Sequence, residues 1–414
     1  MTARNPAAAT LSTRELGRAL LARQHLLERF ATTPARMVGH LLGLQAQAVS
    51  QPPYLGLWSR LDGFTPGQLT ELMERREVVR IALQRGTIHL VTADDCLTLR
   101  PLLQPVLDQA LRNTYGKRLA GVDVDKLAEA GRALVEQEPR TFQQLGALLA
   151  EELPGHDPAA LAQAVRCRLP LVQVPPRGIW GRSGPAAHTT AEHWLGRRPD
   201  ERPSLDAMVL RYLAAFGPAT ATDVQKWCGL TRLGKVLAAL APQLTTFRDE
   251  QGRILYDLPD APRPDAATPA PVRLVAPFDN LLLSHADRSR ILPEEYRSRV
   301  MTVNGLVLGS LLVDGLVAGS WELTEVRPER ARRSGRAEAP GGGQGAAPGG
   351  RAGVPDGQGE GVRGPDGQGA WVVRVRPFTA LGRRDAAAVE EEAGRLLEFT
   401  GGTGVLRIEP PELA

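Results

Sequence analysis

The stretch Val78-Val-Arg-Ile-Ala-Leu-Gln-Arg-Gly-Thr-Ile-His-Leu-Val-Thr92 decides the fold of the first part of the chain. Its β-branched residues predict two strands, and Arg85-Gly86 between them predicts the turn of a hairpin. Upstream, helical patterns begin at capping residues such as Ser12 and the Thr65-Pro66 pair. Helices are predicted over 14–30, 33–45, 52–61 and 65–76. Helices followed by a hairpin outline a winged helix.

The same order of elements recurs twice along the chain. After a connecting helix over 94–115, the second copy has helices over 123–137, 142–153 and 157–169 and a glycine-rich hairpin over 171–185. The third copy has helices over 204–216, 222–228 and 231–240 and a hairpin over 244–258. We therefore predict a predominantly helical α+β protein with three tandem winged-helix units, 1–122, 123–203 and 204–258. Like units in tandem favour a long, repetitive ligand.

A proline-rich linker, 259–271, leads to a C-terminal α+β region, 272–414. We expect strands over 272–276, 300–308, 311–313, 316–323 and 371–376, and a closing helix over 386–399. The segment 331–370 is rich in Gly, Pro, Arg and Gln and contains Pro-Asp-Gly-Gln-Gly twice. This composition cannot bury enough apolar surface to order itself, which predicts a disordered insertion. The alternative is a tail that contacts nucleic acid.

Charge and length set broad limits on the function. The chain has 414 residues, 43% of them hydrophobic, which is enough for several domains. Its net charge is +4, and only four of its 50 basic residues are lysines: Lys117, Lys126, Lys226 and Lys235. Arginine suits phosphates and base edges, so nucleic-acid binding is permitted. The alternative is a GC-rich genome that favours arginine codons.

Cysteine and histidine spacing argues against a metal site. Cys96, Cys167 and Cys228 form no Cys-x-x-Cys pair, and the closest histidines, His188 and His193, are five residues apart. The sequence also has no glycine-rich phosphate loop and no nucleophile motif. We therefore expect no metal and no cofactor.

Hydropathy indicates no membrane segment. The N-terminus has no apolar core of signal-peptide length, and the longest apolar stretch, 305–321, contains Asp314 and four glycines. We expect a cytoplasmic, nucleoid-associated protein without membrane contact.

Gln45-Ala46-Gln47 is the strongest candidate for a functional site. On a helix, residues two apart lie on different sides, so two side chains that point the same way require extended or looped backbone. Pro52-Pro53, shortly after, supports a helix end here because the residue before a proline avoids the α region. A site built on two amides would contain neither an acid nor a base.

Several basic residues are candidates for DNA contacts. Winged helices place one helix in the major groove while a wing reaches a neighbouring groove. The candidates are Arg166 and Arg168 on the second unit's third helix, Arg177 and Arg182 on its wing, and Arg232 and Lys235 on the third unit's third helix. The alternative is that any surface helix carries such residues.

The pattern resembles the AlkZ-like tandem winged-helix DNA glycosylases over nearly the whole chain except the insertion. The resemblance rests on Leu44-Gln-Ala-Gln-Ala48, Tyr54-Leu-Gly-Leu-Trp-Ser-Arg60, Arg85-Gly-Thr-Ile-His-Leu-Val91, Phe216-Gly-Pro-Ala-Thr220 with Asp223, and Pro277-Phe-Asp-Asn280 with Arg288. The family signature is Gln-apolar-Gln; a sister branch has Asp at the second polar place, and this chain does not. The resemblance implies a C-shaped protein that cradles duplex DNA, with Gln45 and Gln47 as catalytic residues on the concave face.

An amide pair fits the chemistry that the resemblance implies. An N7-alkylated guanine is already cationic and leaves the sugar as a neutral base, so no general acid is needed. A glutamine carbonyl can accept a hydrogen bond from the attacking water and direct its negative end at the oxocarbenium ion. Such a site would act on cationic adducts and spare normal purines.

His89 and Asp279 are further candidates. Arg85, at the turn of the first hairpin, is a further candidate for a DNA contact. His89, on the same hairpin, is expected to hydrogen-bond the DNA backbone or to orient Gln47, with a partly buried histidine as the alternative. Asp279 is either a positioning carboxylate or an Asx-turn cap.

The leading hypothesis is a monofunctional, monomeric DNA glycosylase that acts on N7-alkylguanine or N3-alkyladenine in double-stranded DNA and unhooks N7-linked crosslinks. A non-enzymatic winged-helix regulator and an interaction module without nucleic acid are the alternatives.

Overall fold

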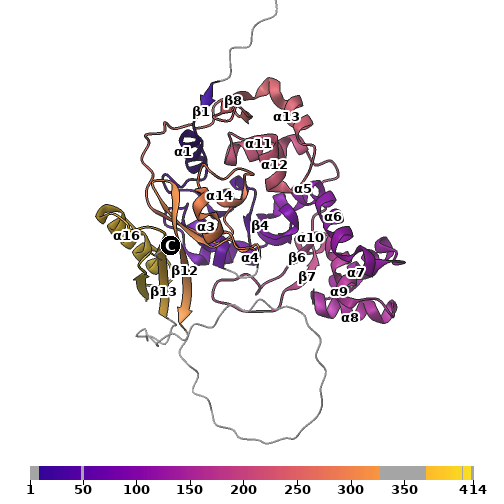
Figure 1. The fold of residues 1–414 in the computed structure, drawn as a ribbon. Helices are drawn as coiled ribbons and strands as arrows, with labels where there is room; N and C mark the ends of the chain where they lie inside the picture. Colours follow the sequence, from indigo (N-terminus) through magenta and orange to yellow (C-terminus); the bar gives the residue numbers. More distant parts are fainter. Residues whose placement is uncertain (1–8, 48–50, 327–369, 403, 412–414) are drawn as a thin grey trace, which may run out of the picture.

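A computed structural model describes residues 9–47, 51–326, 370–402 and 404–411. In Figure 1 the C-terminal strands and the last helix, α16 (Arg383–Phe399), lie at one side. Helices α7 (Val124–Gln137), α8 (Phe142–Glu152) and α9 (Pro158–Arg168) lie at the opposite side, and α11 (Leu205–Phe216), α12 (Ala221–Cys228) and α13 (Gly234–Leu240) lie above. Apart from Ala370, the predicted insertion 331–370 lies outside the described residues.

The first part of the chain forms helices that begin at the predicted caps. Ser12 and Glu15 form a capping box at α1, and Thr65 precedes a proline at α4. Helices α1 and α2 end earlier than predicted, because His25 and Leu42 adopt left-handed backbone at φ 52° and 51°. The elements are β1 (Thr10–Leu11), α1 (Thr13–Arg23), α2 (Pro34–His40), β2 (Leu44–Gln45), α3 (Gln51–Trp58), α4 (Pro66–Glu74), β3 (Val78–Ala82), the 3-10 turn η1 (Gln84–Gly86), β4 (Ile88–Thr92), α5 (Ala93–Leu102), α6 (Gln104–Tyr115) and η2 (Gly116–Leu119).

The second part also begins its helices at capping residues. Asp123, Thr141 and Asp157 each accept a hydrogen bond from the first turn of the helix that follows. The elements are α7 (Val124–Gln137), β5 (Arg140–Thr141), α8 (Phe142–Glu152), α9 (Pro158–Arg168), β6 (Leu171–Gln173), β7 (Ala187–Thr190) and α10 (Ala191–Leu195).

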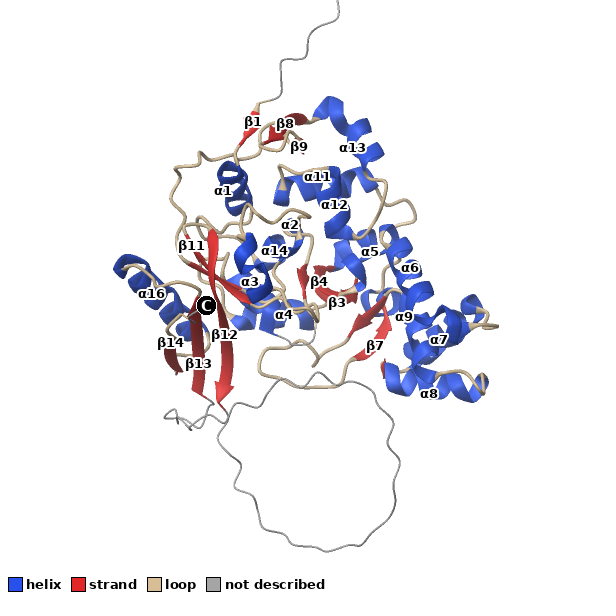
Figure 2. Cartoon of the chain, viewed as in Figure 1, coloured by secondary structure: helices blue, strands red, loops and turns tan. Residues whose placement is uncertain are grey.

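The first two hairpins join into one six-stranded sheet of order β2-β4-β3-β6-β7-β5. Figure 2 labels strands β3, β4 and β7 of this sheet. Strands β3 and β6 pair antiparallel, with Arg80 opposite Gln173 and Ile81 opposite Val172. The sequence predicts a separate wing for each unit, whereas the structure pairs them edge to edge. This pairing is non-local and removes one exposed edge from each hairpin.

The third part forms three helices and a hairpin whose predicted turn is confirmed: Gly252 N–H donates to the Asp249 carbonyl at 2.9 Å. Strand β1 extends this hairpin by pairing in parallel with β8, a contact that the sequence did not predict. The elements are α11 (Leu205–Phe216), α12 (Ala221–Cys228), α13 (Gly234–Leu240), η3 (Ala241–Gln243), β8 (Thr245–Asp249) and β9 (Ile254–Asp257).

The proline-rich linker is held along helix α1 by three arginines. Arg14, Arg18 and Arg23 donate to the carbonyls of Ala266, Thr268 and Pro262 at 2.7, 2.6 and 3.2 Å. The linker thus has fixed partners although it lacks regular structure.

The C-terminal region is a five-stranded sheet of order β10-β11-β12-β13-β14, packed against helix α16. The predicted strand 300–308 is wrong: the chain there ends a short helix and forms a turn closed by the isolated bridge Met301–Val307. Strand β14, parallel to β13, was not predicted. The elements are β10 (Arg273–Val275), α14 (Asn280–Leu283), η4 (Glu294–Tyr296), α15 (Arg297–Val300), β11 (Gly309–Val313), β12 (Leu316–Val326), β13 (Ala370–Pro377), α16 (Arg383–Phe399) and β14 (Gly404–Ile408).

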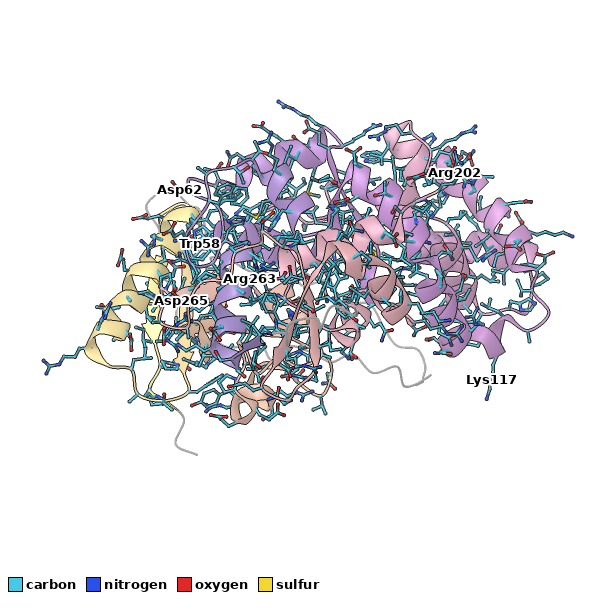
Figure 3. The ribbon with its side chains drawn as sticks, turned by 90° about the horizontal axis from the view of Figure 1, so that it is seen from above. Trp58, Asp62, Lys117, Arg202, Arg263 and Asp265 are labelled. Carbon is cyan, nitrogen blue, oxygen red and sulfur yellow. The ribbon has the colours of Figure 1, made fainter. Side chains whose placement is uncertain are left out.

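Seen from above, Trp58 and Asp62 lie near α16, whereas Lys117 and Arg202 lie at the far end of the molecule (Figure 3). Within the described ranges, no helix combines the length and the apolar character needed to span a membrane.

Candidate active site

Strand β2 carries Gln45 at one edge of the six-stranded sheet. Gln45 lies opposite His89 in the antiparallel pair β2–β4, and Ala46 N–H donates to the Ile88 carbonyl at 2.8 Å. The predicted helix end and extended backbone are therefore confirmed at this point. Strand β2 ends at Gln45, so Gln47 follows it in irregular backbone, with its side chain directed to the backbone of β4.

A tight turn brings the chain from helix α2 into β2. Gly43 has φ 99°, and a Cβ there would lie 2.6 Å from Cγ1 of Val91, so the position requires glycine. Asn280 Nδ2 donates to the Gly43 carbonyl at 2.7 Å. The C-terminal region thus holds the entry to the amide strand.

The two amides are held by different donors. Arg85 Nη2 donates to Gln45 Oε1 at 2.7 Å, and the backbone N–H of Ile88 donates to Gln47 Oε1 at 3.0 Å. Gln45 is 8% exposed, whereas Gln47 is exposed. The first amide is therefore fixed by a partly buried cation, and the second by the neutral backbone N–H of a buried residue.

Arg80 supports the backbone between the amides. Its Nη2 donates to the Ala46 carbonyl at 2.8 Å and its Nε to Gln173 Oε1 at 3.0 Å. Burial lowers the pKa of Arg80 to about 10, so it stays protonated at neutral pH. Arg80 was not among the predicted site residues, although a charged side chain in the middle of the apolar strand 78–82 was a usable signal.

Arg85 lies at the tip of the first hairpin, in left-handed backbone at φ 56°. Its Nη1 donates to the Trp227 carbonyl at the end of α12, at 2.6 Å. Burial lowers the pKa of Arg85 to about 10, with a further contribution from Arg288. A residue predicted as a DNA contact thus links the amide strand to the third unit.

A cavity of about 240 Å³ adjoins Arg85. Its charged lining residues are all cations, namely Arg85, Lys226 and Arg288. Its other walls are formed by Leu283, Met301, Thr302, Gly305, Leu306 and Val307. A cavity with this lining suits an anion next to Gln45.

His89 lies inside the sheet rather than at the surface. It is 1% exposed, and its Nδ1 lies 3.1 Å from the Thr87 carbonyl. Burial, reinforced by the nearby Arg85 charge, lowers the pKa of His89 to about 3, so the ring is neutral at neutral pH. The structure therefore favours the buried-histidine interpretation over a contact with DNA.

Asp279 forms part of the scaffold. It caps α14 by accepting from Leu281 N–H at 2.8 Å, and it pairs with both terminal nitrogens of Arg60 at 2.7 and 2.8 Å. Both side chains are fully buried. The geometry favours the cap interpretation of Asp279.

The predicted DNA-contact arginines divide into two groups. Arg166 donates to the Gly86 carbonyl at 3.0 Å, and Arg168 pairs with Asp125 and Asp108, so both are engaged within the protein.

Arg177 lies near Arg80 and is partly buried. Arg182 is exposed and pairs with Glu74 at 3.5 Å, and Arg232 and Lys235 are exposed at the start of α13. Only this last, exposed set can reach a large ligand without rearrangement.

The site thus offers hydrogen bonds and positive charge rather than proton transfer. Its amides do not titrate, His89 is neutral, and Asp279 is paired with Arg60. Among the described residues, no group of three or more His, Cys, Asp or Glu could hold a metal ion. The arrangement can orient a polar substrate and stabilise charge.

Comparison with known proteins gives consistent matches. The family model "DNA glycosylase AlkZ-like" matches residues 38–339, which include both amides and the cavity cations. An "Interstrand DNA cross-link repair glycosylase" from Streptomyces sahachiroi is 27% identical over 330 residues, covering 73% of this chain and 85% of that protein. The solved structure of Streptomyces sahachiroi DNA glycosylase AlkZ has a TM-score of 0.72 and 20% identity, and the match covers 97% of this chain and 100% of that one. At that identity the structural likeness shows the fold.

Proposed function

Since the chain belongs to the AlkZ-like family of DNA glycosylases, we propose that it hydrolyses the N-glycosidic bond of N7-alkylguanine and N3-alkyladenine in double-stranded DNA. We also propose that it unhooks crosslinks attached through N7, in line with the name of its Streptomyces sahachiroi relative. The observation that carries the proposal is the amide pair: Gln45 on edge strand β2 and Gln47 just after it, each held by a hydrogen bond to its side-chain oxygen.

The chemistry of the pair restricts the substrate. A neutral purine needs protonation before it leaves, and Gln45, Gln47 and neutral His89 cannot supply that proton at neutral pH. A cationic N-alkylpurine needs a placed water and dipoles directed at the developing oxocarbenium ion. The pair therefore supports selection for lesions that already carry positive charge.

Binding of DNA is assigned to the helix-and-hairpin units. We propose that they act as winged helices, that the molecule cradles the duplex in a C shape as a monomer, and that exposed Arg232, Lys235 and Arg182 contact phosphates. The cavity lined by Arg85, Lys226 and Arg288 supports the passage of a strand beside the amides.

The test is the release of free base from methylated duplex DNA. Wild type should release 7-methylguanine and 3-methyladenine, and Gln45→Ala and Gln47→Ala should each lower the single-turnover rate by about 100-fold or more. Gln137→Ala, on the exposed end of α7, is the matched control, and circular dichroism checks folding.

Undiminished release by the variant that carries both substitutions would contradict the site, whereas no release by wild type would contradict the substrate class. Tight binding of one duplex sequence without release would favour the regulator.

A further inference from the structure

We propose that Arg85 is a positioning residue that makes Gln45 a hydrogen-bond donor to the lesion nucleotide and leaves the acceptor role to Gln47. This inference rests on the proposed function and assigns different tasks to two identical side chains. Its basis is the geometry of the two amide oxygens.

The orientation of the Gln45 carboxamide follows from its partner. A guanidinium has only donors, so the Gln45 atom 2.7 Å from Arg85 Nη2 must be the oxygen. The amide nitrogen, on the other branch of the same carbon, then points away from Arg85. Any ligand that meets Gln45 from that side encounters N–H groups.

The charge of Arg85 also changes the strength of the amide. A charge-assisted hydrogen bond is about twice as strong as a neutral one, and linked hydrogen bonds polarise one another. Arg85 draws electron density from Gln45 Oε1, which weakens this oxygen as an acceptor and strengthens the amide N–H groups as donors. Partial burial of Arg85 limits screening of this effect by water.

Gln47 has the opposite arrangement. Its oxygen accepts from the neutral backbone N–H of Ile88 at 3.0 Å, and a carbonyl oxygen has a second lone pair. Because its side chain is exposed, that lone pair can accept from the attacking water. The water and the oxocarbenium ion are therefore assigned to Gln47, and an acceptor atom of the lesion nucleotide to Gln45.

Arg85 is held in place from two other units. Arg166 of α9 donates to the carbonyl of Gly86, the next residue, at 3.0 Å, and Arg85 itself donates to Trp227 of α12 at 2.6 Å. A Cβ on Gly229, after α12, would lie 3.4 Å from Cα of Arg85. The turn is thus packed between the second and third units, which fixes the guanidinium before substrate binds.

The first experiment compares Gln45→Glu with Gln47→Glu. The Gln45→Glu variant keeps the size of the side chain and its contact with Arg85, but its carboxylate has no N–H to donate. We expect its single-turnover rate at saturating enzyme to fall by about 100-fold or more, comparable to loss of a transition-state hydrogen bond. The Gln47→Glu variant keeps acceptor oxygens and should retain measurable release, about tenfold below wild type. The reverse order of the two rates would overturn the proposal.

The second experiment is a double-mutant cycle. Arg85→Met should lower the rate in the wild-type background and have little further effect in a Gln45→Ala background, because Arg85 acts through Gln45. Arg85→Lys should restore part of the rate, and the affinity for undamaged duplex, measured separately, should change less than the rate. Equal losses in both backgrounds would show a merely structural role for Arg85 and contradict the inference.

Thermal melting of each variant reports folding. If Arg85→Met does not fold, Arg85→Lys replaces it in the double-mutant cycle. Release by wild type is measured first. If wild type releases no base, the proposed function fails; if it does and Gln45→Glu stays active, only this inference fails.

Discussion

The hairpin β3–β4 and the pair β6–β7 are both predicted wings, yet they serve different purposes. The first has a three-residue turn, Gln84–Gly86, that places Arg85 between Gln45 and Trp227. The second has a long connection, 174–186, whose Trp180 packs against Tyr54, Trp371 and Phe399 at ring distances of 5.2, 5.7 and 5.4 Å. The packing of this glycine-rich connection is thus determined by the contacts of Trp180, and not by its glycine content.

The largest effect is expected for Trp180, whose ring packs the connection 174–186 against other parts of the chain. Trp180→Ala should lower the free energy of unfolding by about 2 to 3 kcal/mol, somewhat below the loss for a fully buried aromatic because Trp180 is partly exposed. Urea unfolding measures this. Trp194→Ala, where the ring contacts Arg76 at 4.0 Å, is the matched control. An equal loss of unfolding free energy in the two variants would contradict the prediction that Trp180 contributes more to stability than Trp194.

The next effect concerns the buried histidine that each hairpin carries. Burial lowers the pKa of His89 on β4 to about 3 and that of His188 on β7 to about 4, from an ordinary 6.5. Below pH 6.5 the unfolded chain binds these protons and the folded protein does not, so stability is present above that pH and is lost as pH falls toward 4. Each histidine should contribute a slope of about 1.4 kcal/mol per pH unit.

Urea unfolding at pH 7, 6 and 5 measures this slope. His89→Gln and His188→Gln should each reduce it between pH 6 and 5, by similar amounts. His193→Gln, at an exposed position, is the control. If His89→Gln or His188→Gln keeps the wild-type slope of unfolding free energy against pH, the lowered pKa of that histidine is contradicted.

A smaller effect is expected where the two hairpins meet. Arg80→Met keeps the apolar stem but removes the hydrogen bonds to Ala46 and Gln173. The rate of base release should fall about fivefold, about 1 kcal/mol, because the backbone between the amides is no longer fixed. Gln173→Met leaves the bond to Ala46 and should cost less. An unchanged rate in Arg80→Met would show that Ala46 needs no support.

The smallest effect on stability is expected for an exposed arginine, compared with an arginine that is hydrogen-bonded within the protein. Arg182→Ala loses an exposed ion pair and should change the free energy of unfolding by less than about 0.5 kcal/mol. As a phosphate contact, it should lower the slope of log affinity against log salt by about 0.9. Arg166→Ala, which loses the bond to Gly86, should instead cost about 1.5 kcal/mol. An unchanged salt slope for Arg182→Ala would remove the second wing from the DNA interface.

Local signals in the sequence located most elements. Ser12, Thr141 and Asp157 cap the helices predicted after them, and Asp249–Gly252 closes the predicted hairpin. These features depend on residues within one turn of each other, so a single sequence contains the information. The extended backbone at Gln45 could be predicted from the sequence for the same reason.

The remaining features depend on contacts between distant residues. The pairing of β3 with β6, the parallel strand β14 and the bond from Arg85 to Gln45 join segments whose own patterns do not encode the partner. The segment 300–308 has the composition of a strand, but its backbone pairs within a local turn between Met301 and Val307. Burial of His89 and pairing of Asp279 likewise follow from three-dimensional packing.

The position of β2 at the end of the six-stranded sheet has a dynamic consequence. Edge strands open by local fluctuation at lower free energy than central strands, and β2 has only two residues. The amides therefore lie on and just after a short edge strand, and their order depends on the hydrogen bonds from Arg80, Arg85 and Asn280. The backbone amide hydrogens of β2 should exchange with solvent sooner than those of the central strand β3, and a bound duplex should slow their exchange.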